Sequence, residues 1–265
     1  MIKITSLTNN TIKEIAKLKD SKNRHFEKKY IIEGYHLVKE AKLANVLETV
    51  IIIDESDQVE NVENILVNDA IIKKLSSTVN PQNIIGICKM TSSNITGSKF
   101  LLLDNINDPG NMGTLIRTAL GFNIDTIIVS NDSVDIYNDK VLRSTQGAIF
   151  NIRIVKKDII EAINFLKMEN IKIIGTTLEN SKSLNQLKLN DKYAIILGNE
   201  ANGVKKEILN LTDINVRIDM NTKLESLNVG VAGGIIMHYL AGNKWKSIVM
   251  VGIIYLAIVI MKIGI

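Results

Sequence analysis

Six short runs rich in Ile, Leu and Val recur through the second part of this 265-residue chain and constrain its fold more than any other feature. The runs are Phe100–Leu103, Thr126–Val129, Ile152–Val155, Ile171–Ile174, Ala194–Leu197 and Asn215–Ile218. Helical stretches lie between most of them. Short apolar strands that alternate with helices are typical of a mostly parallel α/β sheet with helices on both faces. Because ligands bind such sheets at the carboxyl ends of the strands, the loops there form the candidate site.

A smaller α/β unit precedes this sheet. Its expected elements are helices at about Asn9–Leu18, Tyr35–Ala44 and Asp69–Leu75, and strands at Tyr30–Ile32, Thr49–Ile53 and Ile84–Ile87. The polar, small-residue segment 91–98 is typical of a linker between domains. We therefore expect one domain over residues 1–97, a second over 98–243 and a tail over 244–265.

The net charge of +4 is unevenly distributed. Residues 1–42 hold ten Lys and Arg against five Asp and Glu, whereas residues 43–97 hold three against seven. A basic segment of this kind can neutralise phosphates, although a solvated helix face is the simpler interpretation of so modest an excess. The candidate nucleic-acid contacts are Lys22, Arg24, Lys28 and Lys29.

Several classes of function are disfavoured. The single cysteine, Cys88, is expected to be a small buried side chain, and the three histidines are scattered, so no metal site is indicated. No loop matches a phosphate-binding Walker sequence or a dinucleotide-binding glycine pattern. The start of the chain lacks the features of a signal peptide, so we expect a cytoplasmic protein.

Three loops at strand ends combine glycine, asparagine and acidic residues. They are Asn107–Gly113 with Arg117 downstream, Gly198–Gly203, and Glu225–Val229. Taken singly, each could be an ordinary turn or helix start. Together and in this order, they resemble the three signature motifs of the SpoU/TrmH family of RNA 2′-O-ribose methyltransferases. Residues Lys140, Arg143 and 147–150 are also similar to the family, and residues 24–41 are similar to its N-terminal substrate-binding domain.

The resemblance implies a trefoil knot in the second domain, S-adenosylmethionine as the methyl donor, and a homodimer whose active sites use residues of both subunits. It places five residues where the ribose meets the methyl group, namely Asn111, Arg117, Glu200, Ser226 and Asn228. It implies a cofactor site formed by Thr176, Gly198, Ile218, Ser226 and Leu227. Arg143 joins the candidate RNA contacts, and the RNA is expected to be ribosomal.

Three positions depart from the usual family pattern. Ala201 stands where the family commonly has glycine, Asp219 where it commonly has proline, and Gly230 where it usually has Ser or Ala. We expect these variants to be tolerated. The family arginine is held to be the base for the ribose hydroxyl, but a guanidinium stays protonated in proteins. We expect Arg117 instead to clamp a phosphate and stabilise the developing alkoxide, with Asn111 and Ser226 as hydrogen-bond partners.

The apolar run over residues 247–261 is foreign to the family. It is slightly short for a bilayer span, which takes about 20 apolar residues. An accidental extension is the favoured interpretation, ahead of a membrane anchor over residues 248–265 and of a buried interface helix. Three alternatives remain for the function: the same chemistry on transfer RNA, a methylase that protects the ribosome from an antibiotic, and an RNA-binding protein without catalysis.

Overall fold

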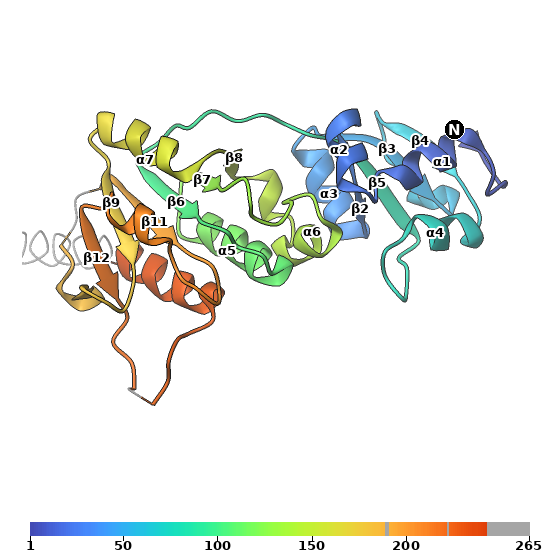
Figure 1. Ribbon diagram of the computed structural model, residues 1–265. Coiled ribbons are helices and arrows are strands. Elements are labelled where there is room, and N and C mark those ends of the chain that lie inside the picture. The colour runs from blue at the N-terminus through green and yellow to red at the C-terminus, as the bar shows by residue number, and fades with distance from the viewer. Residues whose placement is uncertain (189–190, 222, 243–265) are drawn as a thin grey trace, which may run out of the picture.

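The computed structural model describes residues 1–188, 191–221 and 223–242, which form two sheets joined by a single segment (Figure 1). Residues 2–89 supply the first sheet and residues 99–217 the second. Segment 91–98, between them, contains no helix or strand. The apolar tail over 244–265 lies outside the described residues.

The first sheet has five strands in the order β1-β4-β3-β5-β2, and β5 runs antiparallel to both of its neighbours. Its elements are β1 (Ile2–Lys3), α1 (Asn10–Lys17), α2 (Ser21–Glu27), β2 (Lys29–Glu33), α3 (Tyr35–Leu43), β3 (Leu47–Ile52), β4 (Glu63–Leu66), α4 (Asp69–Leu75) and β5 (Ile84–Lys89). The expected helices and strands are present. The sequence did not indicate β4, which begins with two polar residues, nor α2, which is polar along most of its length.

The second sheet has seven strands, all parallel, in the order β10-β12-β9-β11-β6-β7-β8. Its elements are β6 (Lys99–Leu103), α5 (Pro109–Gly121), β7 (Thr126–Val129), α6 (Asp139–Thr145), β8 (Arg153–Lys156), α7 (Ile159–Met168), β9 (Lys172–Thr176), β10 (Lys182–Ser183), β11 (Tyr193–Leu197), α8 (Lys206–Leu209) and β12 (Ile214–Arg217). A further helix covers residues 229–242. The predicted mixed α/β architecture with a parallel sheet is confirmed.

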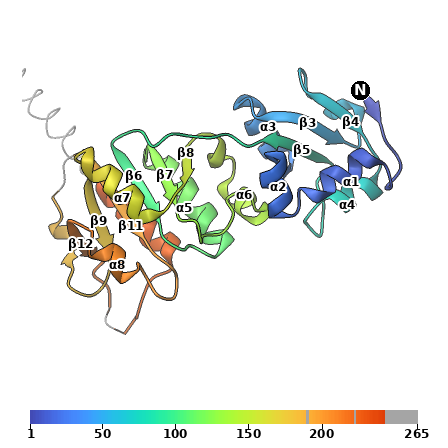
Figure 2. The same cartoon turned by 45° about the horizontal axis from the view of Figure 1, so that its top comes forward.

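Both faces of this sheet are covered, as the alternation of side chains along β6 requires. Leu101 and Leu103 belong to a core that includes residues of α5 and of the helix 229–242. Phe100 and Leu102 belong to a second core with residues of α7 and α8. Figure 2 shows the sheet between these two layers. The helices therefore leave the carboxyl ends of the strands free for the loops.

The two sheets meet through a shared apolar core, to which Tyr30, Leu37 and Leu142 all contribute. The rings of Tyr30 and Tyr137 pack against each other across the junction, with centroids 4.4 Å apart and planes tilted by 34°. Burial raises the pKa of Tyr30, so its phenol stays neutral. Removing either part of the chain at the linker would expose these side chains to water.

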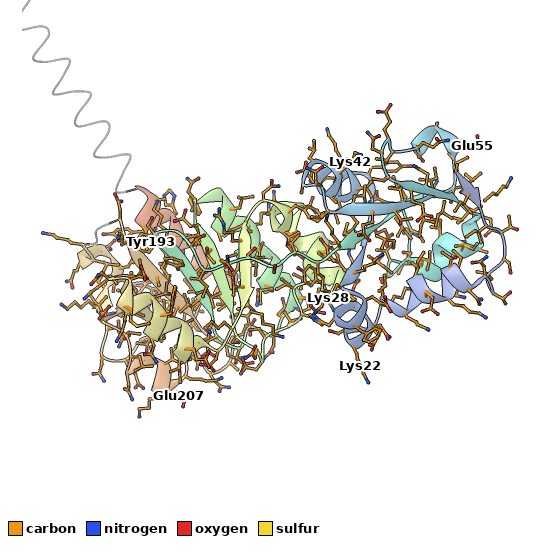
Figure 3. The ribbon with its side chains drawn as sticks, turned by 90° about the horizontal axis from the view of Figure 1, so that it is seen from above. Lys22, Lys28, Lys42, Glu55, Tyr193 and Glu207 are labelled. Carbon is orange, nitrogen blue, oxygen red and sulfur yellow. The ribbon has the colours of Figure 1, made fainter. Side chains whose placement is uncertain are left out.

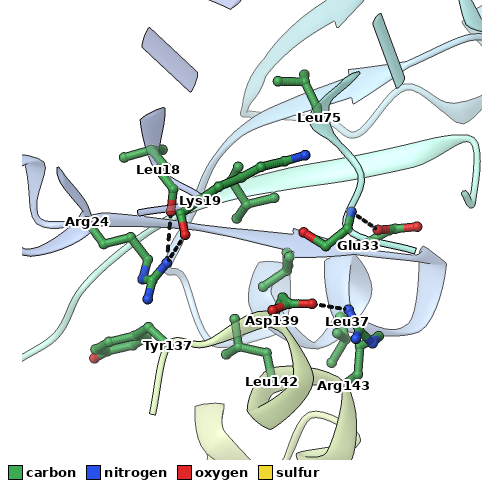
Figure 4. Close-up of a pocket in the computed structure, with 13 residues that line it drawn as sticks. Leu18, Lys19, Arg24, Glu33, Leu37, Leu75, Tyr137, Asp139, Leu142 and Arg143 are labelled. Atoms are coloured by element: carbon green, nitrogen blue, oxygen red, sulfur yellow. Dashed lines mark hydrogen bonds and ion pairs between the residues drawn. The ribbon is translucent and has the colours of Figure 1, made fainter. Parts of the chain in front are cut away.

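A buried ion pair closes one side of this junction. Arg24 Nη2 lies 2.5 Å from Asp135 Oδ2, and its Nη1 donates to the carbonyl oxygens of Leu18 and Lys19, as Figure 4 shows in part. Ser21 Oγ donates to the same Asp135 oxygen at 2.8 Å. The assignment of Arg24 to RNA binding is therefore corrected: its side chain is 7% exposed, and its guanidinium is already occupied by protein acceptors.

Candidate functional site

The first motif loop begins the long helix α5 and fixes the direction of its first turn. Asp108 caps the helix, its Oδ1 accepting from Asn111 N–H at 2.7 Å, and Pro109 follows at the first helical position. Proline suits this position because its missing N–H has no partner there in any helix. The backbone N–H of Asp108 also points toward Glu200 Oε1 at 3.4 Å. Capping thus places Asn111 beside the second motif loop.

A chain of side-chain hydrogen bonds joins all three motifs. Asn228 Nδ2 donates to Asn111 Oδ1 at 2.9 Å, and Asn111 Nδ2 donates to Glu200 Oε1 at 3.1 Å. Asn228 Oδ1 in turn accepts from the N–H groups of Gly230 and Val231, at the start of the helix 229–242. Each amide is thereby held in one orientation. The structure brings together three residues that are 89 and 117 positions apart in the sequence.

A cavity of about 960 Å³ opens beside this chain of hydrogen bonds, between the ends of β9, β11 and β12. All five residues expected to bind the cofactor line it: Thr176, Gly198, Ile218, Ser226 and Leu227. Glu200 lines it as well, which places the cavity against the hydrogen-bonded residues. The volume lies at the upper end of the range for small-molecule sites.

Gly198 makes the wall of this cavity possible. A Cβ on Gly198 would lie 2.2 Å from backbone atoms of Gly203 and Val204, so the loop can fold back on itself only if residue 198 lacks a side chain. Gly203 has a φ of +68°, a conformation that costs glycine little. Asn199 and Gly203 pair through an isolated β-bridge, which closes the loop. A close backbone approach of this kind suits a ligand held by main-chain groups.

Two of the departures from the family pattern, at Ala201 and Asp219, are accommodated by local contacts. Ala201 does not adopt a positive φ, and its N–H donates to Asn199 Oδ1 at 2.9 Å. Asp219 accepts from Ser183 Oγ and pairs with Arg217. No strain is visible at either position, so the sequence variation there is accommodated locally.

Arg117 and Ser226 are exposed and stand apart from the hydrogen-bonded chain. Ser226 lines the cavity, but Arg117 projects from α5 and makes no ion pair or hydrogen bond with any residue that the structure describes. Asn111 and Arg117 are six positions apart on the helix and so occupy different faces. Within one chain, the structure therefore does not bring Arg117 to Asn111.

The remaining cationic candidates differ in availability. Lys22 and Lys28 are exposed where the first sheet adjoins the second, as Figure 3 shows. Lys29 pairs with Glu48 at 2.8 Å, and Arg143 pairs with Asp139 at 2.7 Å. Exposed pairs of this type are weak, so either cation can exchange its partner for a phosphate at small cost.

Lys140 is similar to the family in sequence but was not among the predicted site residues, and the structure places it on α6 near the first motif loop. Its Nζ lies 3.8 Å from Asp108 Oδ2. Helix α6 reaches this position because it packs closely on α5, where a Cβ on Gly113 would lie 2.3 Å from Ser144 Cβ. In the sequence, Gly113 was the residue that could have indicated close packing of a second helix on α5. Only the structure shows that this helix is α6 and that it brings Lys140 near the motifs.

Lys205 is a residue near the site that the sequence did not single out. Its Nζ lies 2.9 Å from Asp132 Oδ2 and 3.5 Å from the buried Asp104 Oδ1, and these carboxylates raise its pKa, the hydrogen bond to Asp132 most. Lys205 also lines the cavity. It ties the second motif loop to the end of β6.

Cys88 is buried and its thiol pKa is raised by burial, which agrees with a packing role. Across residues 1–188, 191–221 and 223–242, no three His, Cys, Asp or Glu side chains are grouped so as to hold a metal ion. In the same residues, no helix combines the length and apolar character needed to cross a membrane.

Two family models match the chain. Residues 98–238 match the SpoU rRNA Methylase family, and residues 9–86 match the MRM3-like substrate binding domain. The first match covers the parallel sheet together with all three motif loops, and the second covers most of the first sheet.

Individual proteins support the same assignment. The chain is 34% identical to the Bacillus subtilis 23S rRNA (guanosine(2553)-2′-O)-methyltransferase RlmP, over 91% of this chain and all of that protein. It superposes on the AdoMet-bound rRNA methyltransferase of Sinorhizobium meliloti with a TM-score of 0.82 at 26% identity, covering 89% of this chain and 96% of that one.

AviRb of Streptomyces viridochromogenes, a SpoU methyltransferase, shares the fold with a TM-score of 0.81 at 19% identity, covering 89% of this chain and 98% of that one. The motifs, the fold and these matches agree. The chain belongs to the SpoU rRNA Methylase family and is an S-adenosylmethionine-dependent RNA methyltransferase.

Proposed function

We propose that this protein methylates a ribose 2′-hydroxyl of ribosomal RNA, with residues 1–97 as the RNA-docking domain and 98–243 as the catalytic domain. The observation that carries this proposal is the hydrogen-bonded chain Asn228–Asn111–Glu200 beside a cavity large enough for the methyl donor. The proposal includes the trefoil knot, a homodimer and a cytoplasmic location. The B. subtilis relative named above is a 23S rRNA enzyme, which favours ribosomal over transfer RNA.

The volume and the mixed polar and apolar lining of the cavity suit S-adenosylmethionine. The backbone of the loops that hold Gly198, Ile218 and Leu227 would bind the adenosine and methionine parts, with Thr176 at the adjacent strand end. Leu197, Val216, Val229 and Ile236 add apolar walls. When bound, the cofactor supplies a methyl group on a positively charged sulfur, which is a good leaving group.

The residues of this chain then have to position the ribose and accept a hydrogen bond from its 2′-hydroxyl, which makes the oxygen more nucleophilic. Glu200 Oε1 is engaged by Asn111, whereas Oε2 accepts no hydrogen bond from the described part of the chain, so it is free to accept one from a ribose hydroxyl. Asn111 holds that carboxylate in place, and Asn228 orients Asn111 by donating to its Oδ1. Ser226, exposed at the cavity, adds a hydroxyl partner. Holding two reactants aligned can lower a barrier by about 7 to 11 kcal/mol.

Arg117 completes the proposed mechanism as a phosphate clamp. Its guanidinium remains protonated and can bind a phosphate oxygen pair or a developing alkoxide. Because Arg117 does not reach Asn111 within one chain, we propose that it acts in the site of the second subunit. Exposed apolar side chains on the helix 229–242, Val231 at 53% and Ile235 at 39%, lie one turn apart and suit a subunit interface.

The test is methyl transfer from radiolabelled S-adenosylmethionine to RNA purified from cells lacking the protein. Incorporation into ribosomal RNA, mapped to one ribose 2′-oxygen, is the expected result. Incorporation into transfer RNA alone would contradict the substrate. Tight RNA binding without any incorporation would contradict the enzymatic proposal and favour an inactive RNA-binding protein.

Mixed dimers test the subunit arrangement. A dimer of one Arg117→Lys protomer and one Glu200→Gln protomer has one intact site if these residues come from different subunits. We expect such mixtures to recover activity that neither pure variant shows. A monomer in sedimentation, or no recovery in the mixture, would contradict the shared site.

A further inference from the structure

Phe26, on helix α2 in the first part of the chain, is unusually exposed for an aromatic residue. Its side chain is 82% exposed, the most exposed aromatic ring among the described residues. A single exposed apolar side chain is common and by itself carries no functional meaning. Its surroundings on helix α2 are what make it informative.

Helix α2 is held firmly against the second sheet. Ser21 and Arg24 both donate to Asp135, and His25 Nε2 lies 3.7 Å from the other oxygen of the same carboxylate. Arg24 is buried, whereas Phe26, two positions later, faces solvent. The helix backbone that carries Phe26 is therefore anchored to the catalytic part of the chain, and the ring itself projects into solvent.

Cations flank this ring. Lys22 lies four positions before Phe26 and so occupies the same helix face, and Lys28 follows at the end of the helix. Both lysines are exposed and, within the part of the chain that the structure describes, neither forms an ion pair. Figure 3 shows them next to the catalytic part. An exposed ring beside unpaired ammonium groups is the arrangement that single-stranded nucleic acid recognises.

The other aromatic residues of this region do not offer the same surface. Tyr30 is buried and packs against Tyr137. Tyr35 is exposed, but its hydroxyl donates to Asp57, whose carboxylate would repel a phosphate. Phe26 is thus the ring of residues 1–97 that combines the greatest exposure with unpaired lysines close by on its helix, Lys22 and Lys28, which outnumber the one exposed acid beside it, Glu27.

We propose that Phe26 is a stacking platform for an unpaired base of the RNA substrate and that Lys22 binds an adjoining phosphate. This inference rests on the proposed function and adds to it the class of RNA recognised: a loop or bulge with a base turned outward, in addition to the target nucleotide. Sequence-specific RNA recognition uses such splayed bases, stacked on aromatic side chains.

The experiment measures initial rates of methylation against the concentration of ribosomal RNA from cells lacking the protein, using full-length variants. We expect Phe26→Ala to raise the KM for RNA about 5-fold to 100-fold, with kcat and cofactor affinity unchanged. Phe26→Trp should preserve the KM, and Phe26→Leu should not, because leucine is apolar but cannot stack. Lys22→Ala should weaken RNA binding and reduce the slope of its salt dependence by about one.

Leu43→Ala is the matched control, since Leu43 is 68% exposed in the same domain but lies at the end of α3. Its KM should equal that of the wild type. A KM for Phe26→Ala within twofold of wild type, or a wild-type KM for Phe26→Leu, would overturn the inference. Equilibrium RNA binding by the same variants separates the two proposals: binding that depends on Phe26 without methyl transfer would contradict only the proposed catalysis.

Discussion

Asp135 and Glu200 are both carboxylates at which distant parts of the chain meet, yet their surroundings differ. Asp135 lies in the junction between the sheets, 16% exposed, and accepts from Ser21, Arg24 and the N–H of Tyr137. Glu200 is exposed at the strand ends, and only its Oε1 accepts hydrogen bonds from the described residues.

The difference separates a carboxylate that stabilises from one that is available to a substrate. Every good hydrogen bond to Asp135 comes from the protein itself, so the group contributes to folding and has no capacity left for a ligand. Glu200 is positioned but not saturated, as an active site requires. We therefore expect changes at the junction to alter stability and changes at the strand ends to alter turnover or binding.

The largest effect is expected for Asp135→Asn. This change leaves Arg24 charged and buried without its partner, and breaking such a pair costs about 3 to 5 kcal/mol. Denaturant unfolding should show the loss, while kcat of the folded enzyme stays near the wild-type value. Asp139→Asn is the control because its pair with Arg143 is exposed, and it should cost less than about 1 kcal/mol. A large loss of kcat in folded Asp135→Asn would contradict the assignment of Asp135 to stability alone.

The same carboxylate predicts a pH dependence. Burial alone would raise the pKa of Asp135, but hydrogen bonds from Arg24, Tyr137 N–H and Ser21 outweigh it and hold the pKa below the ordinary 3.8. Because the pKa of Asp135 is lower in the folded state than in the unfolded chain, the ionised carboxylate stabilises the folded state at pH values above 3.8. This stabilisation disappears as the pH falls from 3.8 through the lower pKa of the folded state. When the free energy of unfolding is measured at decreasing pH, it should fall more steeply for the wild type than for Asp135→Asn.

Arg117→Lys tests the strand-end side of the comparison. Lysine keeps the charge but loses the planar pair of donors, so we expect turnover to fall about 100-fold to 1,000-fold. Cofactor affinity, measured by calorimetry, should be unchanged because Arg117 does not line the cavity. Normal turnover by the lysine variant would show that a bidentate clamp is not needed.

Gly198→Ala should weaken cofactor binding about 5-fold to 100-fold, because the added Cβ has no space in the loop and overpacking of this kind costs about 1 to 3 kcal/mol. Gly121→Ala is its control, since a Cβ there meets nothing within 4 Å. Calorimetry should find wild-type affinity for Gly121→Ala. Unchanged affinity in Gly198→Ala would mean that the loop does not form the cofactor site.

Lys140→Ala is expected to have the smallest effect, a rise in the KM for RNA of about 5-fold to 10-fold if its ammonium leaves Asp108 for a phosphate. Lys140→Arg should restore most of the affinity. Lys157→Ala removes a lysine paired with Glu161 beside α7 and should leave the KM unchanged. Equal effects of Lys140→Ala and Lys157→Ala would indicate a response to net charge alone.

Much of the candidate site could be predicted because the motifs are local. Asp108, Pro109 and Asn111 specify a helix start within a few residues, and the apolar runs specify the strands whose ends carry the loops. The role of Arg24 could not be predicted in this way. An arginine in a basic segment is indistinguishable in sequence from its exposed lysine neighbours, and its partner Asp135 is 111 positions away.

The sequence by itself determined most of the strands and helices, though not β4 or α2, together with the parallel arrangement of the second sheet and the three loops at its edge, because side-chain periodicity and capping act over short distances. Only the tertiary structure decided which polar groups meet. It joined Asn111, Glu200 and Asn228, buried Arg24 and left Phe26 and Arg117 exposed, because long-range packing and desolvation select a partner for each polar group and no local pattern records that choice.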